Sequence, residues 1–157
     1  MLRILLGILL TASTVQAQAI SDRDRFKLFN ACRPMKLVVE NLTPDAQAVG
    51  LTRERIQLAV ESRLRAARLY TESTEKANDT YLYVYIHVVG HAFTIIVSYY
   101  KLVTDLVNNS NGLATTWIAE GTGTSEDAGF IIQGLSGHLD EFLAGYLRVN
   151  EPACDRR

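Results

Sequence analysis

Two stretches of the chain alternate between apolar and polar positions, a pattern that predicts antiparallel β-strands. Residues 81–89 and 92–107 are rich in β-branched and aromatic residues, and the pair Gly90-His91 between them is typical of a two-residue hairpin turn with glycine first. This turn pairs Val89 with Ala92 and fixes the rest of the register. One face of the hairpin is then largely apolar, and we expect it to form the core: Leu82, Val84, Ile86, Val88, Phe93, Ile95, Val97 and Tyr99.

The opposite face of this hairpin combines aromatic and polar side chains. It carries Tyr81, Tyr83, Tyr85 and His87 on the first strand, and Thr94, Ile96, Ser98 and Tyr100 on the second. Tyrosine suits exposed strands, so one interpretation is a solvated surface without a partner. Flat amphipathic surfaces of this kind are also enriched where proteins bind ligands or partners. The first candidate binding surface is therefore Tyr81, Tyr83, Tyr85, His87 and Tyr100.

One further strand is expected before the hairpin in the sequence, and one after it. Residues 35–42 are bounded by Pro34 and by Thr43-Pro44-Asp45, and residues 113–120 follow the turn 108–112. Pairing Val107 with Leu113 would place Trp117 on the core face beside Val103, whereas a shift of one residue would turn it over. The glycine-rich segment 121–125 is expected to be a flexible connection with a faint likeness to an anion-binding loop.

Two amphipathic helices complete the pattern. Thr52 is a suitable N-cap for the first, whose apolar positions Ile56, Val60, Leu64 and Ala67 recur at helical spacing. The second should begin after residues 124–127 and end near Asn150, before Pro152. Its apolar positions are Ala128, Ile131, Ile132, Leu135, Leu139, Phe142, Leu143 and Tyr146.

The predicted order is strand, helix, three strands, helix, which indicates an α+β fold. Because the strands have one apolar face and each helix has an apolar stripe, we expect a two-layer α/β sandwich. Its mainly antiparallel four-stranded sheet would carry both helices on one face, in a single domain of residues 20–157. The first helix would act as the crossover between two strands.

The start of the chain predicts export. A positive start at Met1-Leu2-Arg3, an apolar run from Ile4 to Leu10 and the segment Ala17-Gln18-Ala19 are typical of a signal peptide, here residues 1–19. The expected location is the periplasm or the extracellular space. In such an oxidising compartment Cys32 and Cys154 are expected to form a disulfide, the alternative being unpaired or intermolecular thiols.

Composition narrows the class of protein. Of the 157 residues, 48% are hydrophobic and 21% are charged, which is ordinary for a globular domain. A net charge of −1 gives no overall electrostatic attraction to nucleic acid. Beyond the predicted signal peptide no segment is apolar enough for a transmembrane anchor.

The sequence contains no recognisable catalytic motif or metal-ligand spacing, so we expect neither a cofactor nor a metal. His87 and His91 are four residues apart, but on a strand and a turn this spacing does not bring two imidazoles together. His138 lies near Asp140 and Glu141 on the last predicted helix. A small secreted enzyme that uses His87 or His138 is one alternative function, and the simpler interpretation of His138 is a solvated histidine on the side of a helix.

The predicted helix 52–69 is locally basic. Its arginines outnumber its acids and could meet an anionic envelope surface or partner, or could simply be solvated: Arg53, Arg55, Arg63, Arg65 and Arg68. The leading hypothesis is nevertheless a non-enzymatic exported module for binding or envelope assembly. Its partner would be an envelope protein or a small ligand, met through the tyrosine-bearing strands. The sequence does not predict an oligomeric state.

Overall fold

The computed structural model describes residues 19–73 and 79–156. The predicted signal peptide, apart from residue 19, lies outside the described residues. The elements in chain order are α1 (Asp22–Leu28), β1 (Lys36–Val39), α2 (Pro44–Ala48), α3 (Arg53–Ala66), β2 (Tyr81–Val89), β3 (Ala92–Thr104), β4 (Asn111–Thr124) and α5 (Ala128–Cys154).

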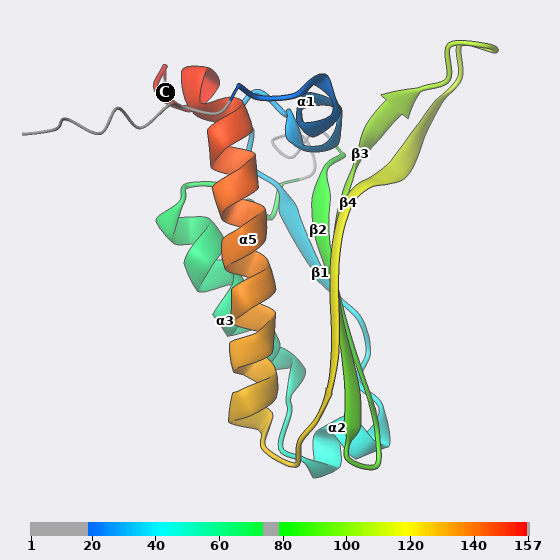
Figure 1. Cartoon of the computed structure of the whole chain (residues 1–157), viewed down its shortest axis with the longest axis vertical. Coiled ribbons are helices and arrows are strands. Elements are labelled where there is room, and N and C mark those ends of the chain that lie inside the picture. Colours follow the sequence, from blue (N-terminus) through cyan, green and yellow to red (C-terminus); the bar gives the residue numbers. More distant parts are fainter. Residues whose placement is uncertain (1–18, 74–78, 157) are drawn as a thin grey trace, which may run out of the picture.

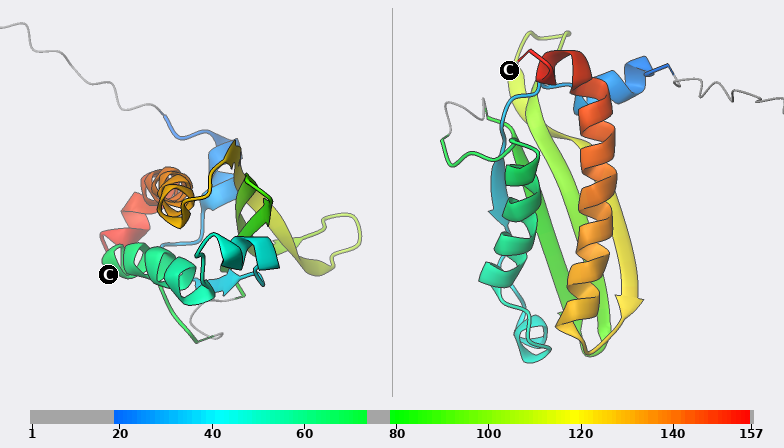
Figure 2. Two further views of the ribbon diagram at one scale, coloured as in Figure 1. Left: turned by 90° about the horizontal axis from the view of Figure 1, so that it is seen from below. Right: turned by 90° about the vertical axis from the view of Figure 1, so that its left-hand side faces the viewer.

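The strands form one mixed sheet in the order β1-β2-β3-β4. β1 is parallel to β2, and the other neighbours are antiparallel. The β1–β2 connection contains α3, the predicted crossover helix. α3 and the long α5 lie side by side on the same face of the sheet (Figure 1), and a second view agrees (Figure 2). The predicted α+β fold with an open, mainly antiparallel four-stranded sheet is confirmed.

The predicted hairpin is confirmed residue by residue. Val89 pairs with Ala92, and the register continues without interruption to Tyr81 opposite Tyr100. Gly90 has a φ of +56°, the left-handed conformation that the first position of this turn requires. All eight predicted core positions of β2 and β3 are buried. The alternation of apolar and polar residues therefore predicted the buried face of the hairpin correctly.

Aromatic side chains fill the centre of the core between the sheet and α5. Trp117 on β4 lies with its ring centroid 5.1 Å from that of Phe142, and Tyr99 lies 5.4 Å from Phe142 and 6.0 Å from Tyr146. Burial raises the pKa of Tyr99 above its ordinary value. The expected core-facing orientation of Trp117 is correct, but its neighbour across the ladder is Tyr99 and not Val103.

The predicted pairing of Val107 with Leu113 is wrong. Leu113 pairs with Leu102, β3 ends at Thr104, and a register shift occurs at Tyr99/Tyr100. The turn between the strands starts earlier than predicted, because the Asp105 N–H donates to the Ser110 carbonyl over 2.8 Å. β3 and β4 therefore continue past the body of the sheet as a projecting hairpin arm, here residues 101–115 (Figure 1).

The glycine-rich segment is also not the predicted loop. Residues 121–124 are the last part of β4 and pair with residues 92–95 of β3. Gly121 and Gly123 face the core side, where a Cβ on Gly123 would lie 2.7 Å from the ring of Phe93. Glycine is therefore used here for close packing in a strand and not for a loop that binds an anion.

Two short helices, α1 and α2, were not predicted. Ser21 caps α1 and Thr43 caps α2, each accepting a hydrogen bond from a backbone N–H three residues later. Pro44 occupies the first turn of α2, where its missing N–H costs no helical hydrogen bond. Seven and five residues are too few to show a helical period.

α5 does not end near Asn150 as predicted, but continues through Pro152 to Cys154. The last turn lies at an angle to the rest of the helix (Figure 2), which accommodates the missing proline N–H. Cys154 forms the predicted disulfide with Cys32, at a Cα–Cα distance of 5.1 Å. The residue bonded to Cys32 is therefore the last residue of the helix, beyond the position where the sequence indicated its end.

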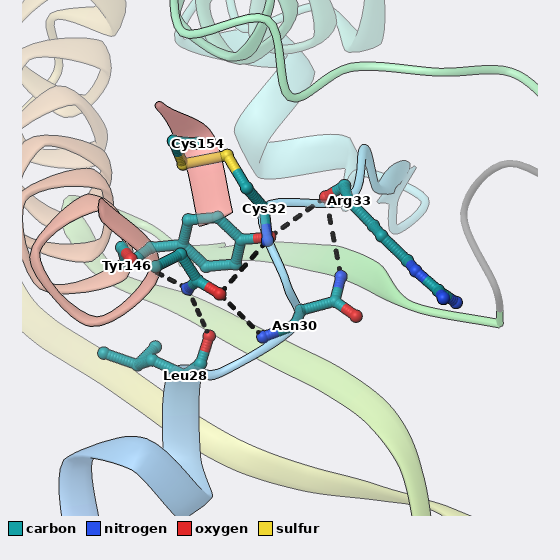
Figure 3. Close-up of a disulfide and its surroundings, with 7 residues drawn as sticks. Leu28, Asn30, Cys32, Arg33, Tyr146 and Cys154 are labelled. Atoms are coloured by element: carbon teal, nitrogen blue, oxygen red, sulfur yellow. Dashed lines mark hydrogen bonds between the residues drawn. A yellow bond between two sulfur atoms is a disulfide. The ribbon is translucent and has the colours of Figure 1, made fainter. Parts of the chain in front are cut away.

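The buried amide of Asn150 reinforces this connection. Its Oδ1 accepts hydrogen bonds from the backbone N–H groups of Asn30 and Cys32, and its Nδ2 donates to the carbonyls of Leu28 and Tyr146, all over 2.8–3.2 Å. The Tyr146 hydroxyl donates to the Arg33 carbonyl over 3.0 Å, in the surroundings of the disulfide (Figure 3). These bonds hold the segment between α1 and β1 in a tight turn in which Ala31 and Cys32 have positive φ.

Candidate functional site

The side of the sheet opposite α3 and α5 is an open face. Because side chains alternate along a strand, the buried positions of β2 and β3 leave Tyr81, Tyr83, Tyr85 and His87 on this side, next to Tyr100 of β3. These five residues are called the tyrosine face below. In the described part of the chain no helix lies over them (Figures 1 and 2). All five side chains are partly exposed.

Contacts between neighbouring rings order the tyrosine face. Tyr81 and Tyr100 stack across the β2–β3 ladder with centroids 4.6 Å apart and planes 8° from parallel. Tyr83 meets the edge of Tyr100 at 6.1 Å, and Tyr85 stacks on His87 at 5.8 Å. A partner that binds these rings would therefore restrict few new rotamers, which lowers the entropic cost of binding.

A hydrogen bond fixes the Tyr83 hydroxyl. It donates to the Glu40 carboxylate over 2.5 Å and so connects β2 to the residue that follows β1. This bond, together with one from the Asn41 N–H and the charge of Arg53, lowers the pKa of the Glu40 carboxyl. The same bond and burial raise the pKa of Tyr83 to about 12. At neutral pH the pair is therefore a neutral phenol bound to a carboxylate.

The structure adds apolar residues that the sequence reasoning did not assign to this surface. Val38 of β1 pairs with Tyr83, and Ile118 of β4 pairs with Ser98. The side chains of Val38 and Ile118 are exposed. Leu102 and Leu113 are exposed opposite each other on the hairpin arm. The order of strands places Val38 and Ile118 beside the tyrosines, whereas Leu102 follows Tyr100 two residues later on the same strand.

The tip of the hairpin arm is the most exposed apolar part of the described chain. Leu106 and Val107 are 92% and 96% exposed. The turn that carries them is ordered by a 2.8 Å hydrogen bond from the Val107 N–H to the Asp105 carboxylate. Exposed aliphatic pairs on a projecting element are characteristic of contact surfaces.

The five arginines of helix 52–69 do not form one free basic surface. Arg63 pairs with Asp140 of α5 at 3.2 Å, and Arg65 pairs with Glu61 at 3.0 Å while its guanidinium lies 4.1 Å from the ring centroid of Tyr70. Arg53 acts electrostatically on Glu40. Arg55 and Arg68 are exposed, the latter just beyond the end of α3 with a φ of +58°. The charge of this helix is therefore partly neutralised within the fold.

The two candidate histidines lie on opposite sides of the sheet. His87 belongs to the tyrosine face, whereas His138 lines a groove of about 520 Å³ between β4 and α5, together with Phe93, Phe130 and Glu141. Across residues 19–73 and 79–156, no hydrogen bond joins either imidazole to a carboxylate or hydroxyl. His91 lies at the hairpin turn, where its Nδ1 is 2.8 Å from a carboxylate oxygen of Glu126.

The described residues contain no group of three or more His, Cys, Asp or Glu side chains suited to a metal ion. None of the helices described is both long enough and apolar enough to cross a membrane. No protein-family model matches the chain, and no functionally described protein or solved structure is significantly similar to it. The function is therefore argued from the surface of the molecule.

Proposed function

We propose that this protein is an exported, non-enzymatic recognition module that binds a protein partner of the cell envelope through the tyrosine face. The observation that carries the proposal is the row of partly exposed, mutually ordered rings on a sheet face that no helix of the described chain covers. Tyrosine combines a large apolar surface with a polar tip, and it is enriched at protein interfaces. The disulfide supports the oxidising compartment that this proposal requires.

The size of the surface favours a protein over a small molecule. Nine residues of β2 and four strands span about 30 Å by about 15 Å, roughly 450 Å². Small ligands prefer concave sites, whereas a stable protein interface needs about 800 Å² on each side. The exposed leucines of the hairpin arm extend the surface toward that size. We therefore include Leu102, Leu106, Val107 and Leu113 in the proposed interface.

Site-specific photocrosslinking in the native envelope tests the proposal. A benzophenone amino acid at position 85 should capture a discrete protein, because Tyr85 lies in the middle of the tyrosine face. The matched control is the same probe at position 58, since Leu58 is an exposed apolar residue on α3. Capture from position 58 and not from position 85 would place the interface on the helical layer.

Alanine substitution tests how much the tyrosines contribute to the affinity for the partner. The double variant Tyr81→Ala/Tyr85→Ala should weaken capture by about tenfold or more, because buried aromatic anchors dominate interface energies. The thermal unfolding midpoint should change little, because the lost contacts lie outside the core. Unchanged capture would move the site elsewhere. Binding to anionic vesicles that salt abolishes would instead favour the arginines of α3.

A further inference from the structure

Within the described residues, the outer edge of β4 has no backbone partner along its last part. β4 is the final strand of the sheet and pairs only with β3. At Thr116, α1 closes the edge, since the Thr116 hydroxyl donates to the Lys27 carbonyl over 2.7 Å. From Trp117 to Thr124, the described part of the chain makes no backbone hydrogen bond on the outer side of β4. Figure 2 likewise shows β4 (yellow) as the outermost strand there.

This edge has few of the features that usually protect one. Residues 117–124 contain no proline or lysine, and the register shift of the β3–β4 ladder lies above them at Tyr99/Tyr100. The only charge is Glu120. The opposite edge differs, because β1 has four residues and the preceding Met35 already bonds with Leu69 and Thr71. An open edge of eight residues, about 27 Å long, is suited to pairing with another strand.

The hairpin register identifies the free backbone groups. In a two-residue hairpin the flanking pair Val89 and Ala92 exchanges hydrogen bonds, so alternate residues from Phe93 onward direct their N–H and C=O toward β4. Their partners, Gly123 and the odd-numbered residues before it, bond inward. The Ser125 N–H, which donates to the His91 carbonyl, follows the same parity. The outward groups therefore belong to Ile118, Glu120, Thr122 and Thr124.

We propose that a second copy of this chain pairs with this edge, β4 against β4 in antiparallel orientation about a two-fold axis at Gly121. Gly121 is the midpoint of the free stretch 118–124. Centring there pairs Ile118 with the partner's Thr124 and Glu120 with the partner's Thr122. About eight backbone hydrogen bonds result, and the two Glu120 side chains do not oppose each other. Two four-stranded sheets become one continuous sheet.

The groove beside β4 supports this arrangement. Gly121 has no side chain on the inner flank, and a Cβ there would lie 2.7 Å from His138 Nε2, so the axis passes beside the groove between β4 and α5. Phe130, which lines that groove, is 53% exposed. A second copy brings its own α5 and groove to the same side of the joined sheet, so both apolar grooves are covered together. The tyrosine faces of the two copies remain free on the other side.

Sedimentation equilibrium of the purified, oxidised protein tests the dimer. The wild type should show a concentration-dependent monomer–dimer equilibrium. Thr122→Pro should raise the dissociation constant by about thirtyfold or more, because each copy loses one outward donor and gains an obstructing ring. Thr122→Val is the matched control, since it keeps the N–H and should dimerise like the wild type. Near-ultraviolet circular dichroism checks that both variants are folded.

Hydrogen exchange resolved by residue identifies the interface. The amides of Ile118, Glu120 and Thr122 should become protected as the protein concentration rises, whereas those of Ala119 and Gly121 should be protected at every concentration. A wild type that stays monomeric at the highest attainable concentration overturns the proposal, even if a foreign protein protects these amides in the envelope. A dimer whose even-numbered amides remain unprotected overturns it as well.

Discussion

The hydroxyl of Tyr83 on the open face of the sheet connects β2 to the residue after β1 and favours the ionised form of the carboxyl that it binds. Tyr83 donates to Glu40, and the bond favours the ionised carboxylate and the neutral phenol at the same time. The two pKa values therefore move in opposite directions, which makes the contact measurable by titration.

Tyr83→Phe should raise the pKa of the Glu40 carboxyl toward its ordinary value of 4.5, because the largest cause of its lowering is removed. Titration followed by NMR measures this change, and Tyr85→Phe is the control, since Tyr85 makes no bond to Glu40 in the described structure. The variant should also lose the part of the pH dependence of folding stability that Tyr83 contributes in the wild type at alkaline pH. Between pH 10.0 and about 12 the folded state retains the Tyr83 proton that the unfolded chain has lost, so stability falls as pH rises. An unchanged Glu40 titration would contradict the assignment.

The C-terminal turns of α5 and the segment between α1 and β1 form one unit at the level of elements. Asn150 uses both donors and both acceptor positions of its amide to join them, and its side chain is completely buried. The disulfide closes the same junction four residues later. The C-terminal end of α5 therefore holds the segment between α1 and β1 in place.

Asn150→Ala should lower the free energy of unfolding by about 3 kcal/mol or more, because it removes the partners of the buried backbone groups of Cys32 and Leu28 and of the half-buried N–H of Asn30. Urea unfolding of the oxidised protein measures the loss. Asn30→Ala is the matched control: within the described structure its side chain makes two long hydrogen bonds, of 3.3 and 3.5 Å, so we expect a loss below about 1 kcal/mol. Equal losses in the two variants would show that the buried amide has no special role.

At the scale of the whole molecule, two layers and one covalent bond define the protein. The helical layer buries one side of the sheet, and the disulfide joins residues 122 positions apart in the sequence. A loop of this length restricts the unfolded chain strongly, so the bond acts mainly on the unfolded state. The tyrosine face lies on the other side of the sheet, and its order does not depend directly on the bond.

Reduction, or the double variant Cys32→Ala/Cys154→Ala, should lower the free energy of unfolding by about 4–5 kcal/mol in the entropic description. Parallel denaturant titrations with and without a reductant measure the difference. The stacked tyrosines should keep their near-ultraviolet circular dichroism wherever the reduced protein is still folded. Two titratable thiols in non-reducing denaturant would contradict the intramolecular bond.

Much of the candidate site followed from the sequence because strand alternation is a local property. The turn at Gly90 fixed the hairpin register, and the register placed Tyr81 opposite Tyr100. Glu40, Val38 and Ile118 could not be assigned to the same surface in this way. Their proximity depends on which strands are neighbours, and residues far apart in the sequence decide that.

The sequence by itself determined the elements whose signals lie within a few residues: the hairpin, the cap at Thr52, the apolar stripes of both long helices and the single possible internal pairing of two cysteines. Tertiary structure alone decided that residues 121–124 are a strand, because a glycine and threonine repeat acquires that conformation only by pairing with β3. It also decided that α5 passes through Pro152, where long-range bonds to the N-terminal segment offset a local preference to stop. Local patterns fix conformation where neighbours in sequence supply the energy, and contacts across the fold fix it where they do not.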